Sequence, residues 1–114
     1  MSVTPKSWLL MLIALAGSSL TGQEKHKASA GAVIFKEKCA LCHGADGSGN
    51  TPLGKQLHAA DLRAANVRRA GDTGVYRVVH DGRANMPPFS DQLTHKEIVQ
   101  VVKYVRVLAK TPQR

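Results

Sequence analysis

Residues 39–43 read Cys39-Ala40-Leu41-Cys42-His43, and this stretch decides how the rest of the chain is interpreted. Two cysteines that are separated by two residues and followed directly by histidine form the C-x-x-C-H pattern of c-type haem attachment. Each thiol is able to add to one vinyl group of the haem, and the next imidazole then falls where it binds the iron. The pattern predicts one haem c bound covalently at Cys39 and Cys42, with His43 as an iron ligand.

The cysteine pair is also open to three other interpretations. A thioredoxin-like dithiol is expected in a βαβ context, which does not follow here. A zinc site needs four ligands, and the chain has no second cysteine pair. A disulfide across two residues would close a very small loop, which constrains the unfolded chain little. The histidine that follows the pair favours haem over each of them.

The first 22 residues have the layout of a secretory signal peptide. Lys6 precedes an apolar run from Trp8 to Ala16, and a small polar stretch follows. The run is shorter than the roughly 20 residues that a membrane-spanning helix needs. We therefore expect residues 1–22 to be a cleaved signal and the protein to be exported to the periplasm or an equivalent compartment; an uncleaved membrane anchor is the alternative. Residues 23–29 are polar, and we expect a flexible lead-in there.

The remaining length allows one small domain, over residues 30–111, and its patterns predict helices. The spacing of apolar residues predicts a first helix over about 30–40. Turn-forming residues predict a loop over 44–54, a short helix is possible near 59–62, and a solvated bend is expected over 66–70.

The second half of the domain carries clearer helix signals. Asp72 or Thr73 is a candidate N-cap for a helix that runs to about His80, and Gly82 then suits its C-terminal end; the β-branched residues at 75–79 leave a strand as the alternative. Prolines predict an irregular loop over 83–92. Thr94 and Glu97 form a capping box in front of an apolar stripe that extends to about residue 108.

The core predicted for this domain is thin. Outside the expected signal peptide (residues 1–22, called the leader below) the chain has four aromatic residues, namely Phe35, Tyr76, Phe89 and Tyr104. Small domains usually need an additional stabilising element, and a covalently held haem would supply a large flat apolar body for short helices to surround.

Met86 is the predicted second axial ligand. Met1 and Met11 lie in the leader, so Met86 is the one methionine of the expected mature chain. Iron held by His and Met has a raised reduction potential and no open position, which suits electron transfer. The alternative is a second histidine, with candidates His58, His80 and His95.

Several motifs in order make the chain resemble a class I c-type cytochrome, similar to cytochromes c6 and c551 and to the haem subunits of cbb3-type oxidases. The motifs are Gly31-x-x-x-Phe35-x-x-x-Cys39, Cys42-His43-Gly44-x-Asp46-Gly47-x-Gly49, Asp81-Gly82-x-x-x-Met86-Pro87-x-Phe89 and the final helix with Tyr104.

This resemblance implies an all-α fold of three to five short helices around one haem, in which the first and last helices cross. It implies that Gly31 and Phe35 meet Val101 and Tyr104. It also implies that the carbonyl of Pro52 accepts a hydrogen bond from the His43 ring.

The function expected from these residues is an exported, monomeric carrier of one electron at a time between redox proteins, not an enzyme. The alternatives are a haem subunit held in a membrane complex, and a peroxidase or gas-binding protein in which Met86 is not bound to the iron.

The chain has 16 Lys and Arg against 8 Asp and Glu, a formal net charge of +8. We expect this charge to favour acidic patches of redox partners; nucleic acid is disfavoured because the basic residues are scattered and the chain carries an export signal.

Overall fold

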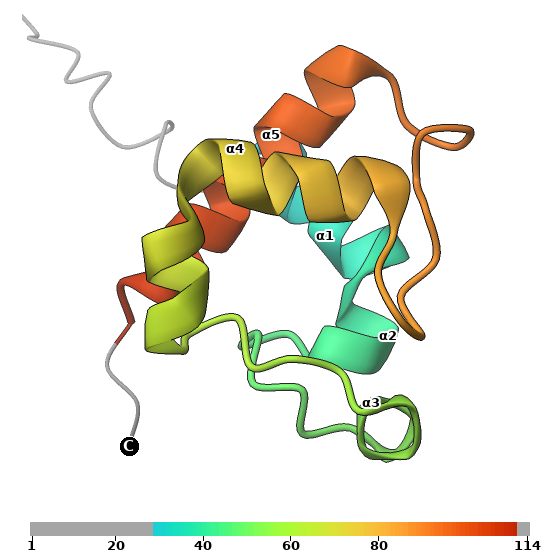
Figure 1. Ribbon diagram of the computed structural model, residues 1–114, viewed down its shortest axis with the longest axis vertical. Coiled ribbons are helices and arrows are strands. Elements are labelled where there is room, and N and C mark those ends of the chain that lie inside the picture. Colours follow the sequence, from blue (N-terminus) through green and yellow to red (C-terminus); the bar gives the residue numbers. More distant parts are fainter. Residues whose placement is uncertain (1–28, 112–114) are drawn as a thin grey trace, which may run out of the picture.

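The computed structural model describes residues 29–111, which form five helices (Figure 1). The expected signal peptide and nearly all of the expected lead-in therefore lie outside the described residues. The helices are α1 (Ala30–Lys38), α2 (Ala40–His43), α3 (Pro52–Leu57), α4 (Ala65–Asp81) and α5 (His95–Ala109). Within residues 29–111 the only β-type pairing is an isolated bridge between Arg83 and Met86, so the all-α prediction is confirmed.

The first and last helices cross at Gly31, as predicted. A Cβ at Gly31 would collide with the carbonyl oxygen of Gln100 and would lie 3.1 Å from the Cβ of Tyr104. The rings of Phe35 and Tyr104 pack 5.2 Å apart at an interplanar angle of 56°. Val101, the other expected partner, is fully buried in the same core. The missing side chain of Gly31 thus allows the two backbones to touch.

Helix α5 supplies most of the apolar core. Its capping box is present, because the Thr94 hydroxyl accepts from the Glu97 amide and the Glu97 carboxylate accepts from the Thr94 amide. Leu93 and Ile98, on either side of the cap, are both buried. The buried core cluster consists of Phe35, Val75, Val79, Phe89, Leu93, Ile98, Val101, Val102, Val105 and Leu108.

Helix α4 begins earlier than the sequence predicted. Residues 66–70 are helical, and the expected bend there is wrong; the interruption lies at Gly71, with φ 67° and ψ −179°. This interruption leaves carbonyls of the first segment without helical partners, and Arg106 of α5 donates to the carbonyl oxygens of Val67 and Arg68. Long-range capping therefore stabilises as helix a segment for which the sequence predicted a bend. At the other end Gly82 terminates the helix with φ 77°, as expected.

Helix α3 occupies part of the predicted loop. Thr51 caps it by accepting from the Gly54 amide, and Pro52 takes the first helical position, where its fixed φ and missing N–H are tolerated. The short helix considered near 59–62 is absent, because the chain leaves α3 at His58 and runs irregularly to Leu62. The proline acts here as a helix start instead of a loop signal.

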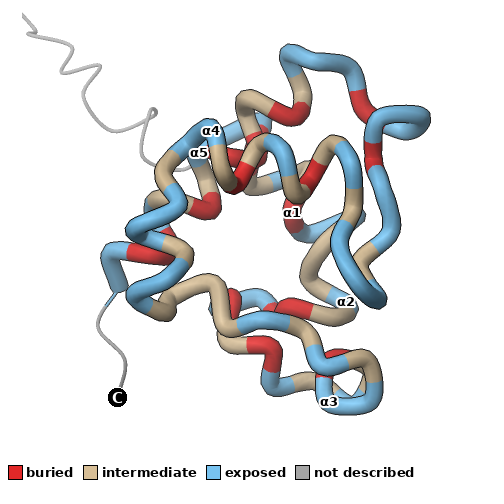
Figure 2. The backbone as a smooth tube through the Cα atoms, in the orientation of Figure 1, coloured by how far each residue is buried: buried red, intermediate tan, exposed pale blue. Residues whose placement is uncertain are grey.

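The helices are arranged as a ring in Figure 1, with α1, α4 and α5 in its upper part and α2 and α3 in its lower part. Helix α5 packs against α1 and α4, whereas α2 packs against α1 and α3. Buried residues occur in separate short runs around the ring (Figure 2). Between Ser29 and Thr111 no helix has the length and apolarity that crossing a membrane requires.

Candidate functional site

The C-x-x-C-H motif lies at the junction of α1 and α2. Helix α1 ends at Cys39, whose φ of −120° and ψ of −36° break the helix, and α2 then carries Cys42 and His43 on one short turn. The amide of His43 donates to the Cys39 carbonyl at 2.9 Å, which closes this turn. The two thiols are free and half-buried. The turn therefore brings the three predicted motif residues together.

The His43 imidazole is oriented by one backbone carbonyl. The ring is buried, with 8% exposure, and its Nδ1 lies 2.9 Å from the carbonyl oxygen of Ala60. A carbonyl oxygen only accepts, so Nδ1 carries the proton and donates. Nε2 of the neutral ring then keeps its lone pair, which is the form that binds a metal. The expected acceptor, Pro52, is wrong because its carbonyl lies in the first turn of α3.

Backbone contacts hold Ala60 in place. The amide of Leu62 donates to the Gly47 carbonyl at 2.7 Å, and a Cβ at Gly49 would lie 2.6 Å from the Ala59 carbonyl oxygen. Asp61 accepts two side-chain hydrogen bonds from Arg63, which lower the pKa of its carboxyl group. No sequence pattern identifies this acceptor, because every residue has a backbone carbonyl. The glycines at 47 and 49 are the one signal in the sequence that the backbone is closely approached here.

Thr51 fixes α3 to the motif. Its hydroxyl lies 2.8 Å from the Leu41 carbonyl oxygen and 3.0 Å from that of Cys42, and it donates to this pair. The same oxygen accepts from the Gly54 amide at 2.8 Å. A Cβ at Gly54 would collide with the Cys42 carbonyl oxygen, so α3 lies directly on the motif backbone.

Met86 lies on a tight turn after α4. The amide of Arg83 donates to the Met86 carbonyl at 3.0 Å, and the Met86 amide donates to the Arg83 carbonyl at 2.9 Å. The Met86 side chain is half-buried and packs against the core cluster. A Cβ at Gly82 would lie 2.8 Å from the Met86 carbonyl oxygen. The turn therefore has a defined shape and directs an apolar thioether toward the interior.

Two of the three alternative histidines are exposed, and the third is half-buried with its ring bonded to a neighbouring carboxylate. His58 is exposed at the end of α3, in a left-handed conformation with φ 57°. His80 Nδ1 is bonded to the carboxylate of Asp81 at 2.6 Å, and its side chain is 44% exposed. His95 Nδ1 lies 2.8 Å from the hydroxyl of Tyr76. Each is therefore less suited than Met86 to a buried ligand position.

The surroundings of the cysteines argue against the other interpretations of the pair. Burial, with a smaller contribution from the Cys42 thiol, raises the pKa of Cys39 to about 11. Catalytic dithiols instead have a lowered pKa, which makes the thiolate available. Among residues 29–111 no group of three or more His, Cys, Asp and Glu side chains is placed to hold a metal ion. Cys39 therefore lacks the activation of a redox dithiol, and within residues 29–111 the cysteine pair lacks the companions of a zinc site.

The arrangement of the helices fits a haem. Within residues 29–111, neither α2 nor α3 packs against α4 or α5. Partly buried apolar side chains from both parts surround the core, among them Cys39, Ala40, Leu62 and Met86. An imidazole with an unprotonated nitrogen and a thioether sulfur are the donors that cytochromes c use for haem iron. Two thiols, these two donors and an apolar lining are what a covalently bound haem requires.

A protein-family model described as cytochrome C oxidase, cbb3-type, subunit III, matches residues 26–105 of the chain. The chain belongs to this family and is a class I c-type cytochrome. As such it carries covalently bound haem c with its iron, and its general function is haem-based electron transfer. The predicted family, fold class and cofactor are thus confirmed, whereas the individual haem-binding residues stay predictions.

Two kinds of relative are similar to this cytochrome. It is 37% identical to cytochrome c6 of Rippkaea orientalis over 68% of either protein. It is 33% identical to the cbb3-type cytochrome c oxidase subunit FixP of Sinorhizobium medicae over 75% of this chain and 32% of that protein. The chain thus spans about a third of the length of this oxidase subunit.

A solved structure shows the same fold. The KustC0563 c-type cytochrome superposes with a TM-score of 0.63 and 30% sequence identity, over 70% of this chain and 98% of the other. The superposition supports the all-α architecture of this chain as that of a c-type cytochrome.

Proposed function

We propose that this cytochrome is an exported electron carrier whose haem is attached through Cys39 and Cys42 and ligated by His43 and Met86. The observation that carries the proposal is the hydrogen bond from His43 Nδ1 to the Ala60 carbonyl, at 2.9 Å. This bond selects the tautomer whose Nε2 binds iron and prevents the ring from turning. When bound, the haem supplies a one-electron couple; the chain orients its ligands and excludes water.

The role of Met86 follows from its place in the fold. A thioether ligand raises the reduction potential, and a second protein ligand leaves no position for a substrate. The half-buried Met86 is held by a hydrogen-bonded turn, whereas His58 and His95 are exposed and the ring of His80 is bonded to the Asp81 carboxylate. An iron held in this way transfers electrons and does not turn over a substrate, so we propose a carrier and not an enzyme.

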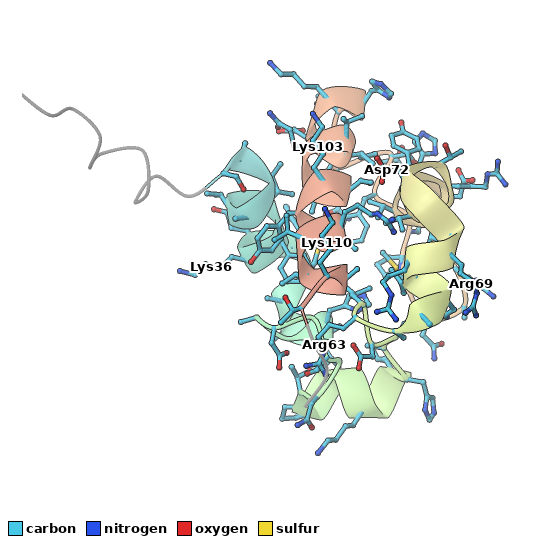
Figure 3. All side chains as sticks on the ribbon, turned by 90° about the vertical axis from the view of Figure 1, so that its left-hand side faces the viewer. Lys36, Arg63, Arg69, Asp72, Lys103 and Lys110 are labelled. Carbon is cyan, nitrogen blue, oxygen red and sulfur yellow. The ribbon has the colours of Figure 1, made fainter. Side chains whose placement is uncertain are left out.

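The charge of the protein supports acidic redox proteins as partners. Two of its acidic side chains are paired internally, Asp61 with Arg63 and Asp72 with Arg106. In Figure 3, Lys36 of α1 and Arg69 of α4 project on either side of α5, which carries Lys103 and is followed directly by Lys110. These four cations are exposed, and together with the formal net charge of +8 they support a positive surface. Such a surface raises encounter rates with acidic partners more than it prolongs the complex.

The proposal that the protein is exported is based on its first 22 residues. Residues 1–22 have the composition of a secretory signal, and haem attachment at C-x-x-C-H takes place outside the cytoplasm. We propose cleavage of the leader and a periplasmic or equivalent location. A haem subunit of a membrane complex is the second candidate, because several relatives are named as cbb3 oxidase or bc1 complex subunits. Mass spectrometry of the native protein separates the two, since an intact residue 1–22 segment in membrane fractions supports the subunit.

The proposed chemistry is tested on the purified ferric and ferrous protein. Acid–acetone extraction should leave the haem on the polypeptide, and Cys39→Ser combined with Cys42→Ser should release it. A redox titration should show a single one-electron transition. Haem in the acetone supernatant of the unmodified protein would contradict attachment, and peroxide turnover at a substantial rate would indicate an open iron position instead of Met86.

A further inference from the structure

Asn85 connects the Met86 turn to the part of the molecule that carries the motif. Its Nδ2 donates to the carbonyl oxygen of Leu57 at 3.0 Å, across 28 residues of sequence. Within residues 29–111 it is the one hydrogen bond between the 82–93 loop and the 39–64 segment. Figure 1 shows this loop descending from α4 toward α2 and α3. This side chain therefore joins the loop to the part of the molecule that carries the motif.

The acceptor of this bond is fixed relative to His43. Leu57 is the last residue of α3, and a carbonyl at a helix C-terminus has no helical partner. Helix α3 is in turn bonded to the motif by Thr51, whose hydroxyl lies within 3.0 Å of the Leu41 and Cys42 carbonyl oxygens. The Leu57 carbonyl therefore keeps a fixed position relative to the motif.

The donor of this bond is fixed relative to Met86. Two hydrogen bonds between Arg83 and Met86 close a turn, and Ala84 and Asn85 form its tip. Ala84 has a φ of 51°, which is uncommon for a residue with a side chain and indicates a constrained tip. Because Asn85 and Met86 are neighbours in this small turn, a hydrogen bond at Asn85 sets the position of Met86.

We propose that Asn85 is a positioning residue that latches the Met86 turn onto the C-terminus of α3 and so holds Met86 in its ligand position. The proposal rests on the proposed ligation by Met86. Without the latch, the loop would still be tied to α4, through the Phe89 amide and the Val79 carbonyl, but would be free to swing away from α3. Asn85 therefore controls how often Met86 leaves the iron.

The test measures how fast added imidazole replaces the sixth ligand in the ferric protein. At saturating imidazole this rate reports how often the loop releases the ligand. Asn85→Ala should raise the rate about five- to tenfold, the factor that corresponds to the net worth of one hydrogen bond. Asn66→Ala, which removes an exposed amide on α4, should leave it unchanged. Asn85→Asp keeps the size but replaces the donor by an acceptor, so it should behave like Asn85→Ala.

Amide hydrogen exchange of the loop gives a second readout. Protection at Met86 should fall in Asn85→Ala, while protection at Phe89, whose amide stays bonded to the Val79 carbonyl, and in α5 is retained. An Asn85→Asp protein that matches the unmodified protein in both measurements would overturn the latch. The packing of the side chain, and not its hydrogen bond, would then hold the loop in place.

The Met86→Ala protein separates this failure from failure of the proposed ligation. If Met86→Ala binds imidazole directly, without the slow release step, while Asn85→Ala matches the unmodified protein, only the latch is wrong. If Met86→Ala is as slow as the unmodified protein, another residue is the ligand, and the ligation and the role of Asn85 are both overturned.

Discussion

Gly71 and Gly82 adopt nearly the same backbone conformation, but only Gly82 is enclosed by other backbone atoms. Gly71 has φ 67° and ψ −179°, and Gly82 has φ 77° and ψ 168°. A Cβ at Gly71 would meet nothing within 4 Å, whereas one at Gly82 would lie 2.7 Å from the Pro88 nitrogen and 2.8 Å from the Met86 carbonyl oxygen. A side chain at Gly71 would therefore meet backbone strain alone, whereas a side chain at Gly82 would meet the same strain and also collide with the loop.

Alanine substitutions at these two glycines should differ in both stability and spectrum. Gly71→Ala should cost about 1–3 kcal/mol from the strained conformation alone. Gly82→Ala should cost about 1–3 kcal/mol more, since the loop must shift as well. The weak red absorption band of an iron–thioether bond should diminish only in Gly82→Ala. Equal unfolding free energies for the two variants, with the band intact in both, would contradict the tight contact at Gly82.

The contact between Gly31 and Gln100 predicts a cost for any side chain at the helix crossing. Gly31→Val should lower the free energy of unfolding by about 1–3 kcal/mol, because the backbones of α1 and α5 must separate. Ala30→Val adds the same side chain at an exposed position of α1 and serves as the control. Denaturant unfolding of both variants measures the difference. Similar stabilities for the two would show that the helices do not cross at Gly31.

The ring contact between Phe35 and Tyr104 should be measurable as a coupling energy. The single variants Phe35→Leu and Tyr104→Leu and their combination form a double-mutant cycle for rings that lie 5.2 Å apart. A coupling of about 0.5–1.5 kcal/mol is expected for such an aromatic pair. Strictly additive effects on the unfolding free energy would mean that the rings pack independently.

The positive surface predicts how salt affects electron transfer. Oxidation of the ferrous protein by the hexacyanoferrate(III) anion should slow as the Debye length falls from about 30 Å at about 0.01 M to about 3 Å at about 1 M salt. A cationic cobalt(III) complex is the matched control and should show the opposite trend. A rate with the anion that is independent of salt, or rises with it, would exclude the basic surface from the approach route.

The features predicted from the sequence are those that local rules determine. The capping box at Thr94 and Glu97 and the helix end at Gly82 follow from short-range patterns. The crossing at Gly31 was instead implied by the resemblance to class I c-type cytochromes. The motif alone predicted one turn with two thiols and an imidazole, and the structure has that turn.

The features that were missed depend on distant partners. The first part of α4 is capped by Arg106, which lies 39 residues beyond Val67, so no local sequence pattern predicts this helical segment. The acceptor for His43 is the backbone of Ala60, which has no sequence signature. The latch from Asn85 to Leu57 likewise uses a carbonyl, so it required the arrangement of α3 and the loop in space.

The central claim, ligation by Met86, is tested most directly by proton–carbon NMR of the reduced protein with methyl-labelled methionine. With the leader removed, Met86 is the one methionine, so a single methyl signal is expected. Ligation places this methyl group over the haem, where the ring current shifts its proton resonance far upfield. We predict one such upfield-shifted signal, absent from Met86→Ala. A methyl signal at the position of an ordinary methionine in the reduced, folded protein would contradict the account.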